Sequence, residues 1–221
     1  MVAINTIDHN TPGNSLVTAL SSPNSSTRLQ AALMAGTHPA ASRCESLVAR
    51  CSVEPDFFVR DMLTWALTRH PRDMVVPLLV RELRSEIAQA RSQSLHTLSK
   101  IGDKESWAAI TSDLLHDADD EVARSAWRAA IILVPTGQED WLAAELANEL
   151  GRGDLDTQLS LSRALIAVGG QVPLSLNAAT ASADQKVQAH AIATEKLLAD
   201  PDAEFAQALK DAKRVMITGV I

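Results

Sequence analysis

A polar residue recurs along this chain every 30 to 34 residues, and each recurrence begins a stretch with helical apolar spacing. The position is arginine in the first four cases and glutamine in the last two: Arg28, Arg60, Arg91, Arg124, Gln158 and Gln188. A fixed period of this length is typical of a stack of similar structural units. The apolar residues follow a 3.6-residue period, so each unit is predicted to be a hairpin of two helices.

Proline, glycine and aspartate divide the chain into about six such hairpins joined by short connections. Residues 1–14 lack helical periodicity and are predicted to form an N-terminal arm. Residues 15–221 are predicted to form one repeat domain, because stacked units have no separate globular cores. Its last helix, over residues 203–216, has one apolar face and is predicted to cap the open end of the stack.

The composition suits close-packed helices and narrows the classes of function. Hydrophobic residues make up 46% of the chain, and the formal charge is −7. Residues 101–160 carry 13 acidic but only 4 basic side chains, and this acidity disfavours a nucleic-acid partner, whose phosphates need neutralising. No apolar run approaches the roughly 20 residues that span a bilayer, so the sequence predicts a cytoplasmic protein with no membrane partner.

Two-helix units with an acidic residue at the turn and an arginine early in the second helix resemble HEAT repeats. Asp56 with Arg60, and Asp120 with Arg124, fit this pattern best. The resemblance implies an all-α fold, a right-handed α-α superhelix of about six hairpins followed by the capping helix. In HEAT proteins such Asp and Arg residues usually bridge neighbouring units as a structural ladder. The predicted ladder consists of Arg28, Asp56, Arg60, Arg91, Asp120, Arg124, Gln158 and Gln188.

The stretch from Cys51 to Pro71, followed by residues 95–102, is more specific than a generic repeat. It resembles uncharacterised actinobacterial HEAT-repeat proteins, some of which are joined to a MerR-like DNA-binding domain. This resemblance implies a regulatory or scaffolding setting in a bacterial protein and assigns no ligand. Phycobilin-lyase-type HEAT proteins are a further resemblance, with no residue here that indicates pigment handling.

The second helices of a solenoid lie side by side and form a wall that commonly binds protein segments. Counted from the recurrent polar residue, the position before it and those three, six and seven beyond it are predicted to fill the core. Positions one, four, five and eight beyond it are predicted to form the wall. Wall residues at these positions include Thr64, Ser92, Leu95, Ser125, Ala129 and Ser162.

Five wall residues combine an aromatic anchor with charged or hydrogen-bonding groups, as interaction hot spots do. This predicted partner-binding patch, for a protein or peptide, is Asp61, Trp65, His96, Arg128 and Arg163. The alternative interpretation is that Trp65 packs over a neighbouring helix while the arginines are solvated or paired.

No pattern in the chain indicates a reaction, a metal or a cofactor. There is no glycine-rich phosphate loop, nucleophile elbow or paired-histidine zinc motif. The sequence therefore predicts a non-catalytic scaffold with no catalytic, metal or cofactor site. An alternative is a DNA-binding or repair module like the HEAT-like alkylpurine glycosylases, which use Trp, Asp and Arg on a concave surface. A third alternative is self-association through an exposed end of the stack.

Overall fold

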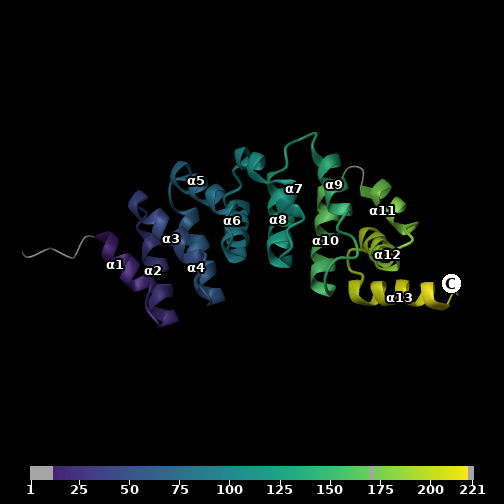
Figure 1. Cartoon of the computed structure of the whole chain (residues 1–221), viewed down its shortest axis with the longest axis horizontal. Helices are drawn as coiled ribbons and strands as arrows, with labels where there is room; N and C mark the ends of the chain where they lie inside the picture. Colours follow the sequence, from purple (N-terminus) through teal and green to yellow (C-terminus); the bar gives the residue numbers. More distant parts are fainter. Residues whose placement is uncertain (1–11, 170–171, 219–221) are drawn as a thin grey trace, which may run out of the picture. The chain divides into compact units, whose positions relative to one another are not determined.

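The computed structural model describes residues 12–169 and 172–218, and every regular element within these ranges is a helix (Figure 1). The chain divides into two compact units, Met1–Ile101 and Gly102–Ile221. The predicted N-terminal arm lies mostly outside the described residues. Its last three residues, however, begin helix α1 (Pro12–Leu20), so the first hairpin starts three residues earlier than predicted. Proline suits this position because the first turn of a helix needs no N–H from it.

The first unit consists of three helical hairpins in two layers (Figure 1). The second helices of these hairpins pack side by side, α4 lying between α2 and α6, while α3 contacts α5 in the other layer. The helices after α1 are α2 (Ser25–Thr37), the 3-10 helix η1 (Ala41–Arg43), α3 (Cys44–Cys51), α4 (Phe57–Thr68), α5 (Arg72–Glu82) and α6 (Ala88–Ile101).

The second unit repeats this arrangement, with α10 between α8 and α12 in one layer and α9 between α7 and α11 in the other. Its first helical segment is divided into a 3-10 helix and a single α-helical turn. The helices are η2 (Lys104–Ala109), α7 (Ser112–Leu115), α8 (Asp120–Leu133), α9 (Glu139–Ala147), α10 (Leu155–Val168), α11 (Val172–Thr180), α12 (Gln185–Ala199) and α13 (Phe205–Thr218).

Short polar side chains cap the N-termini of five second helices and so define where these helices begin. Each accepts a hydrogen bond from a backbone N–H in the first helical turn, where amides lack partners within the helix. These N-cap residues are Asn24 for α2, Asp56 for α4, Asp119 for α8, Asp154 for α10 and Asp184 for α12.

The predicted core positions are confirmed in α4 and α6. In α4 they hold Val59, Leu63, Ala66 and Leu67, all of which are buried. In α8 Trp127 is fully buried, and its indole N–H donates to the Leu115 carbonyl at 2.9 Å. Ile131, the outermost predicted core residue of α8, is only half-buried. A continuous apolar stripe of this width is what a short hairpin must bury against its neighbours.

The terminal helix α13 covers the apolar side of α12. Its Phe205, Ala208, Leu209 and Ala212 are buried together with Ala189, Ala193 and Leu197 of α12. Such a helix removes from water the face that a further repeat would otherwise cover. The prediction of an all-α, HEAT-like superhelical repeat fold with a capping helix is therefore confirmed.

Candidate interaction groove

Five of the six recurrent polar side chains turn back to the segment that precedes their own helix. Arg60 Nη1 donates to the carbonyl oxygens of Glu54 and Pro55 at 2.9 and 2.8 Å. Gln158, which replaces arginine in α10, uses its amide in the same way toward the Gly153 carbonyl at 3.3 Å. Arg28, Arg91 and Gln188 also donate to carbonyls of the preceding turn. The column therefore stabilises each hairpin turn by satisfying carbonyl oxygens there.

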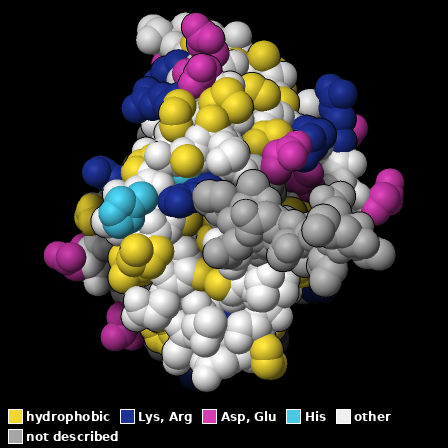
Figure 2. Space-filling model, turned by 90° about the vertical axis from the view of Figure 1, so that its left-hand side faces the viewer, with side chains coloured by type: hydrophobic (Ala, Val, Ile, Leu, Met, Phe, Trp, Pro, Cys, Tyr) yellow, Lys and Arg dark blue, Asp and Glu magenta, His cyan; other side chains and the backbone are white. Residues whose placement is uncertain are grey.

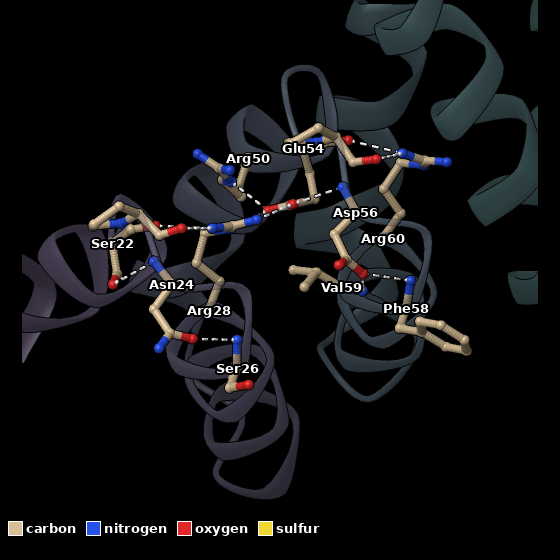
Figure 3. A network of polar contacts seen from close by, with 12 residues as sticks. Ser22, Asn24, Ser26, Arg28, Arg50, Glu54, Asp56, Phe58, Val59 and Arg60 are labelled. Atoms are coloured by element: carbon tan, nitrogen blue, oxygen red, sulfur yellow. Dashed lines mark hydrogen bonds and ion pairs between the residues drawn. The ribbon is translucent and has the colours of Figure 1, made fainter.

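The acid that bridges two hairpins of the first unit is Glu54, not the predicted Asp56 (Figure 3). Arg28 of α2 donates to both carboxylate oxygens of Glu54, at 2.7 and 2.8 Å, and Arg50 of α3 donates at 2.8 Å. Asp56 is the N-cap of α4 and accepts from the N–H groups of Phe58 and Val59. The short Asp56 side chain caps its own helix, whereas the longer Glu54 side chain reaches the neighbouring hairpin.

Glu54 is fully buried yet ionised. Burial alone would raise its pKa, but the hydrogen bonds from Arg28, the Asp56 N–H and Arg50 together lower the pKa to about 2. A buried carboxylate held by this many donors fixes the geometry of the groups around it. We regard this network as structural, because its charged atoms are satisfied by one another.

The second unit has its own bridge, in which Asp120 takes part as predicted but with a different partner. Arg152, from the turn before α10, donates to Asp120 at 2.8 Å and to Glu149 at 2.6 Å. It also bonds to the Asp117 carbonyl, so it joins the turns that precede α8 and α10. Arg124, the predicted partner of Asp120, instead pairs with Glu121 one turn earlier on its own helix, at 2.7 Å.

Arg124 is displaced because α8 begins one residue earlier than the spacing of the column implies. The column residue lies four positions after the N-cap in α4, as Arg60 does after Asp56. In α8 the N-cap is Asp119, so the equivalent position is the buried Ala123, and Arg124 comes one position later. One residue rotates a side chain by about 100° around a helix. Arg124 therefore leaves the column and is half-buried at the side of α8.

The exposed strip of the second helices is narrower than predicted. Within each unit the central second helix, α4 or α10, packs against a second helix on both flanks, so positions beside the strip are covered. Six residues expected on the wall are buried: Thr64, Ser92, Leu95, Ser125, Ala129 and Ser162. Counted from the N-caps, Trp65, Arg128 and Arg163 occupy the same position in α4, α8 and α10. They are thus equivalent residues of three repeats.

The predicted partner-binding patch is distributed over the two units. Asp61 and Trp65 are exposed on α4, and His96 is half-buried on α6, all in the first unit. Trp65 keeps 38% of its surface exposed, and its ring lies against Gly36 of α2. One face of the Trp65 ring therefore packs over a neighbouring helix, as the alternative interpretation expects, while the rest of the side chain stays exposed. Arg128 and Arg163 both belong to the second unit.

Arg128 and Arg163 line one groove between α8 and α10, with a volume of about 540 Å³. Its lining residues are Arg124, Arg128, Ile131, Asp156, Leu159, Ser160, Arg163 and Ala164. Within the described parts of the chain, Arg128 and Arg163 form no hydrogen bond or ion pair, and Arg124 Nε is buried without an acceptor. Burial, reinforced by the charge of Arg124, lowers the pKa of the Arg128 guanidinium.

An apolar pocket of about 450 Å³ continues from this groove along α10 toward α12 and α13. Leu159 and Arg163 of α10 line both hollows, so the two adjoin across the exposed side of α10 as a cationic half and an apolar half. The apolar half is lined mainly by Ile166, Ala167, Leu197, Leu198, Pro201, Ala203 and Phe205, with Glu204 at its side. We call the whole the α8–α13 groove. Sequence reasoning missed its apolar half, although Ile166 lies at a predicted wall position of α10.

Apolar side chains are also exposed at the end of the first unit that α1 and α2 form. Val17 and Met34 are about half exposed there, and a groove of about 380 Å³ includes Leu16 and Met34. Figure 2 looks onto this end and shows small apolar groups separated by charged side chains. No paired arginines line the groove at this end. It therefore lacks the division into charged and apolar halves that marks the α8–α13 groove.

The described residues contain few arrangements suited to chemistry. Ser162 and His190 are 3.0 Å apart, but both are fully buried, so no substrate reaches them. No group of three histidine, cysteine or acidic side chains suited to a metal occurs among the described residues. Cys44 and Cys51 are buried thiols, and burial raises the pKa of Cys51 to about 12, which makes it unreactive. No helix among the described residues is long and apolar enough to cross a membrane.

The comparisons with known proteins agree with the repeat architecture. The sequence model described as HEAT repeats matches residues 45–132, which include the hairpins around Glu54 and Arg124. The chain is a HEAT-like repeat protein. No curated protein matches this HEAT-like repeat protein. The resemblance to actinobacterial proteins associated with MerR-like domains stays a prediction.

Two solved structures resemble the HEAT-like repeat protein only weakly. An engineered protein is 21% identical over 92% of this chain and 98% of its own, with a TM-score of 0.46. The complex of CpcE and CpcF of phycocyanin lyase from Nostoc sp. PCC7120 is 16% identical over 98% of this chain and 100% of the matched chain, with a TM-score of 0.36. The HEAT-like description rests on the matched repeats and on the stacked hairpins.

Proposed function

We propose that this HEAT-like repeat protein is a non-catalytic cytoplasmic scaffold that binds a segment of a protein partner in the α8–α13 groove. The observation that carries the proposal is that two hollows, each large enough for several side chains, adjoin at Leu159 and Arg163 of α10. Exposed faces of stacked second helices are the usual binding surfaces of repeat proteins. A groove with both apolar and charged walls matches the anatomy of protein interfaces.

The charge of the groove favours a protein segment over a nucleic acid. Asp156 lies beside the arginines in its cationic half, and Glu204 lies beside its apolar half. A phosphate backbone would need an uninterrupted positive trough. With a formal charge of −7, the whole chain also repels nucleic acid at long range.

Site-specific photo-crosslinking tests the proposal. A photoreactive amino acid replaces Ala167, an exposed residue of the groove, or Ala144, an exposed residue of α9 in the other layer. In the native cells we expect protein adducts from position 167 that are absent from position 144, and their loss when Leu198→Asp places a charge in the apolar half. Identical adducts from both positions, or adducts to nucleic acid, would overturn the proposal.

A further inference from the structure

We infer that the α8–α13 groove selects a partner segment in which acidic side chains adjoin an aliphatic or aromatic side chain. The inference rests on the proposed function and adds to it the chemistry of the bound segment. It follows from three observations: the arrangement of the arginines, the position of the apolar pocket beyond them, and the acidic residues at the margins.

Three arginines line the cationic half of the groove. Arg124 and Arg128 are one turn apart on α8, and such neighbours on one helix face repel each other. Arg163, from α10, lines the same groove. Among the described residues only Glu121 pairs with any of the three, through Arg124. A carboxylate bound between these guanidinium groups would relieve their repulsion and accept paired hydrogen bonds.

The apolar half lies directly beyond Arg163 and places an apolar residue of the segment next to its acidic part. Leu198 is 40% exposed, although it faces a hollow lined by Ile166 and Phe205. A leucine or phenylalanine side chain buried there would contribute through removal of apolar surface from water on both partners. Since Leu159 and Arg163 belong to both hollows, one extended segment can place an acidic residue in the first and an apolar residue in the second.

The margins of the groove argue against other occupants. Asp156 beside the arginines and Glu204 beside the apolar half would both repel a long run of negative charge in the groove. This limits the acidic part of the segment to a few residues and disfavours a polyanion such as a nucleic acid. It also disfavours a basic segment at the cationic half, where Arg128 and Arg163 would remain without counter-charges.

Binding of designed peptides measured by fluorescence anisotropy tests the inference. The main probe is a short fluorescein-labelled peptide with a run of Glu followed by Leu and Phe, separated by Gly. Matched peptides replace Glu with Lys, or replace Leu and Phe with Ser. We expect the purified protein to bind the main probe about tenfold or more tightly than each matched peptide. Equal binding of the Glu and Lys peptides would overturn the inference.

Variants of the groove give the second arm of the experiment. Arg128→Ala/Arg163→Ala should weaken the main probe about tenfold or more, and Arg128→Glu/Arg163→Glu should transfer the preference to the Lys peptide. The control Arg69→Ala/Arg84→Ala removes two exposed arginines of the first unit and should leave affinity unchanged. A labelled single-stranded oligonucleotide that binds more tightly than the main probe would also contradict the inference.

The two experiments fail independently. If crosslinking finds a protein partner in the groove but the Glu peptide has no advantage, the proposed function stands and the acidic segment is wrong. If position 167 yields no protein adduct in cells, the proposed function fails whatever the peptides do. Unchanged affinity in both arginine double variants, with circular dichroism showing intact helices, would remove the arginines from the site.

Discussion

The Trp65 ring of α4 lies so close to Gly36 of α2 that a β-carbon on Gly36 would come within 2.3 Å of the ring atom Cζ3. The same β-carbon would lie 2.8 Å from the Ala66 α-carbon. Gly36 thus allows α2 and α4 to approach closely, and the Trp65 indole packs directly over the Gly36 backbone. Trp65 has a structural role on its inner face, whatever its exposed edge contacts.

We predict that Gly36→Ala destabilises the first unit by about 1–3 kcal/mol, the usual cost of adding a methyl group to a well-packed interface. The gain in helix propensity from alanine is smaller than this cost. Urea unfolding followed by circular dichroism measures the change, with Gln30→Ala on the exposed side of α2 as the control. In the double variant Gly36→Ala/Trp65→Leu part of the loss should be recovered. A neutral or stabilising Gly36→Ala would show that the helices separate at no cost.

Glu54 is the charge on which the first unit depends most. Glu54→Gln should lower the free energy of unfolding by about 3 kcal/mol, because Arg28 and Arg50 then lose their buried counter-charge. Glu86→Gln, at the exposed turn before α6, is the matched control and should change little. Because the folded-state pKa is lowered from 4.5 to about 2, the stabilisation is full above pH 4.5 and disappears as the pH falls toward 2. Acid unfolding of wild type that coincides with that of Glu54→Gln would contradict this.

His190 is held neutral inside the second unit. The Gly151 N–H donates to Nδ1 at 3.0 Å, so the imidazole proton is on Nε2, which is 3.0 Å from the Gln158 carbonyl oxygen. Burial is the main reason that the pKa is lowered from 6.5 to about 4. A second proton on Nδ1 would oppose the Gly151 N–H directly. This arrangement couples α12 to α10 and to the turn before α10.

We predict that His190 makes the protein less stable as the pH falls from 6.5 toward 4. The unfolded chain takes up the proton first, so the loss is about 1 kcal/mol at pH 5.5 and about 3 kcal/mol at pH 4. Urea unfolding at pH 7 and 5.5 should show this slope in wild type and not in His190→Gln, whose side chain does not titrate. The same slope in both proteins would place the titrating group elsewhere.

The register of α8 predicts unequal roles for two arginines that look equivalent in the sequence. Arg60→Ala removes charged hydrogen bonds to two turn carbonyls and should cost about 1.5–3 kcal/mol. Arg124→Ala removes only the pair with the exposed Glu121 and should change stability by less than about 0.5 kcal/mol. Parallel thermal and urea unfolding of the two variants measures the difference. A large loss of stability in Arg124→Ala would contradict this prediction and show that Arg124 has the same structural role as Arg60.

Local pattern determined much of this architecture. The 3.6-residue spacing identified the second helices and their buried positions, as Val59, Leu63 and Leu67 show, because a helix that packs in a stack must bury one stripe. The amphipathic C-terminal segment identified α13 as a cap for the same reason. Breaks at Pro, Gly and Asp located the turns, since these residues favour or require non-helical backbone.

Tertiary structure decided which groups meet. Asp119 and Asp120 are both suitable caps in the sequence, and only the folded turn shows that Asp119 caps α8, which moves Arg124 out of the column. Glu54 reads as a polar residue of a break until Arg28, 26 positions away, is brought to it. The α8–α13 groove likewise needs three second helices and the cap to enclose it. Periodicity determines the helix face on which a side chain lies. Which residues distant in sequence meet depends on how the helices pack against one another, and the pattern of a single helix does not contain that information.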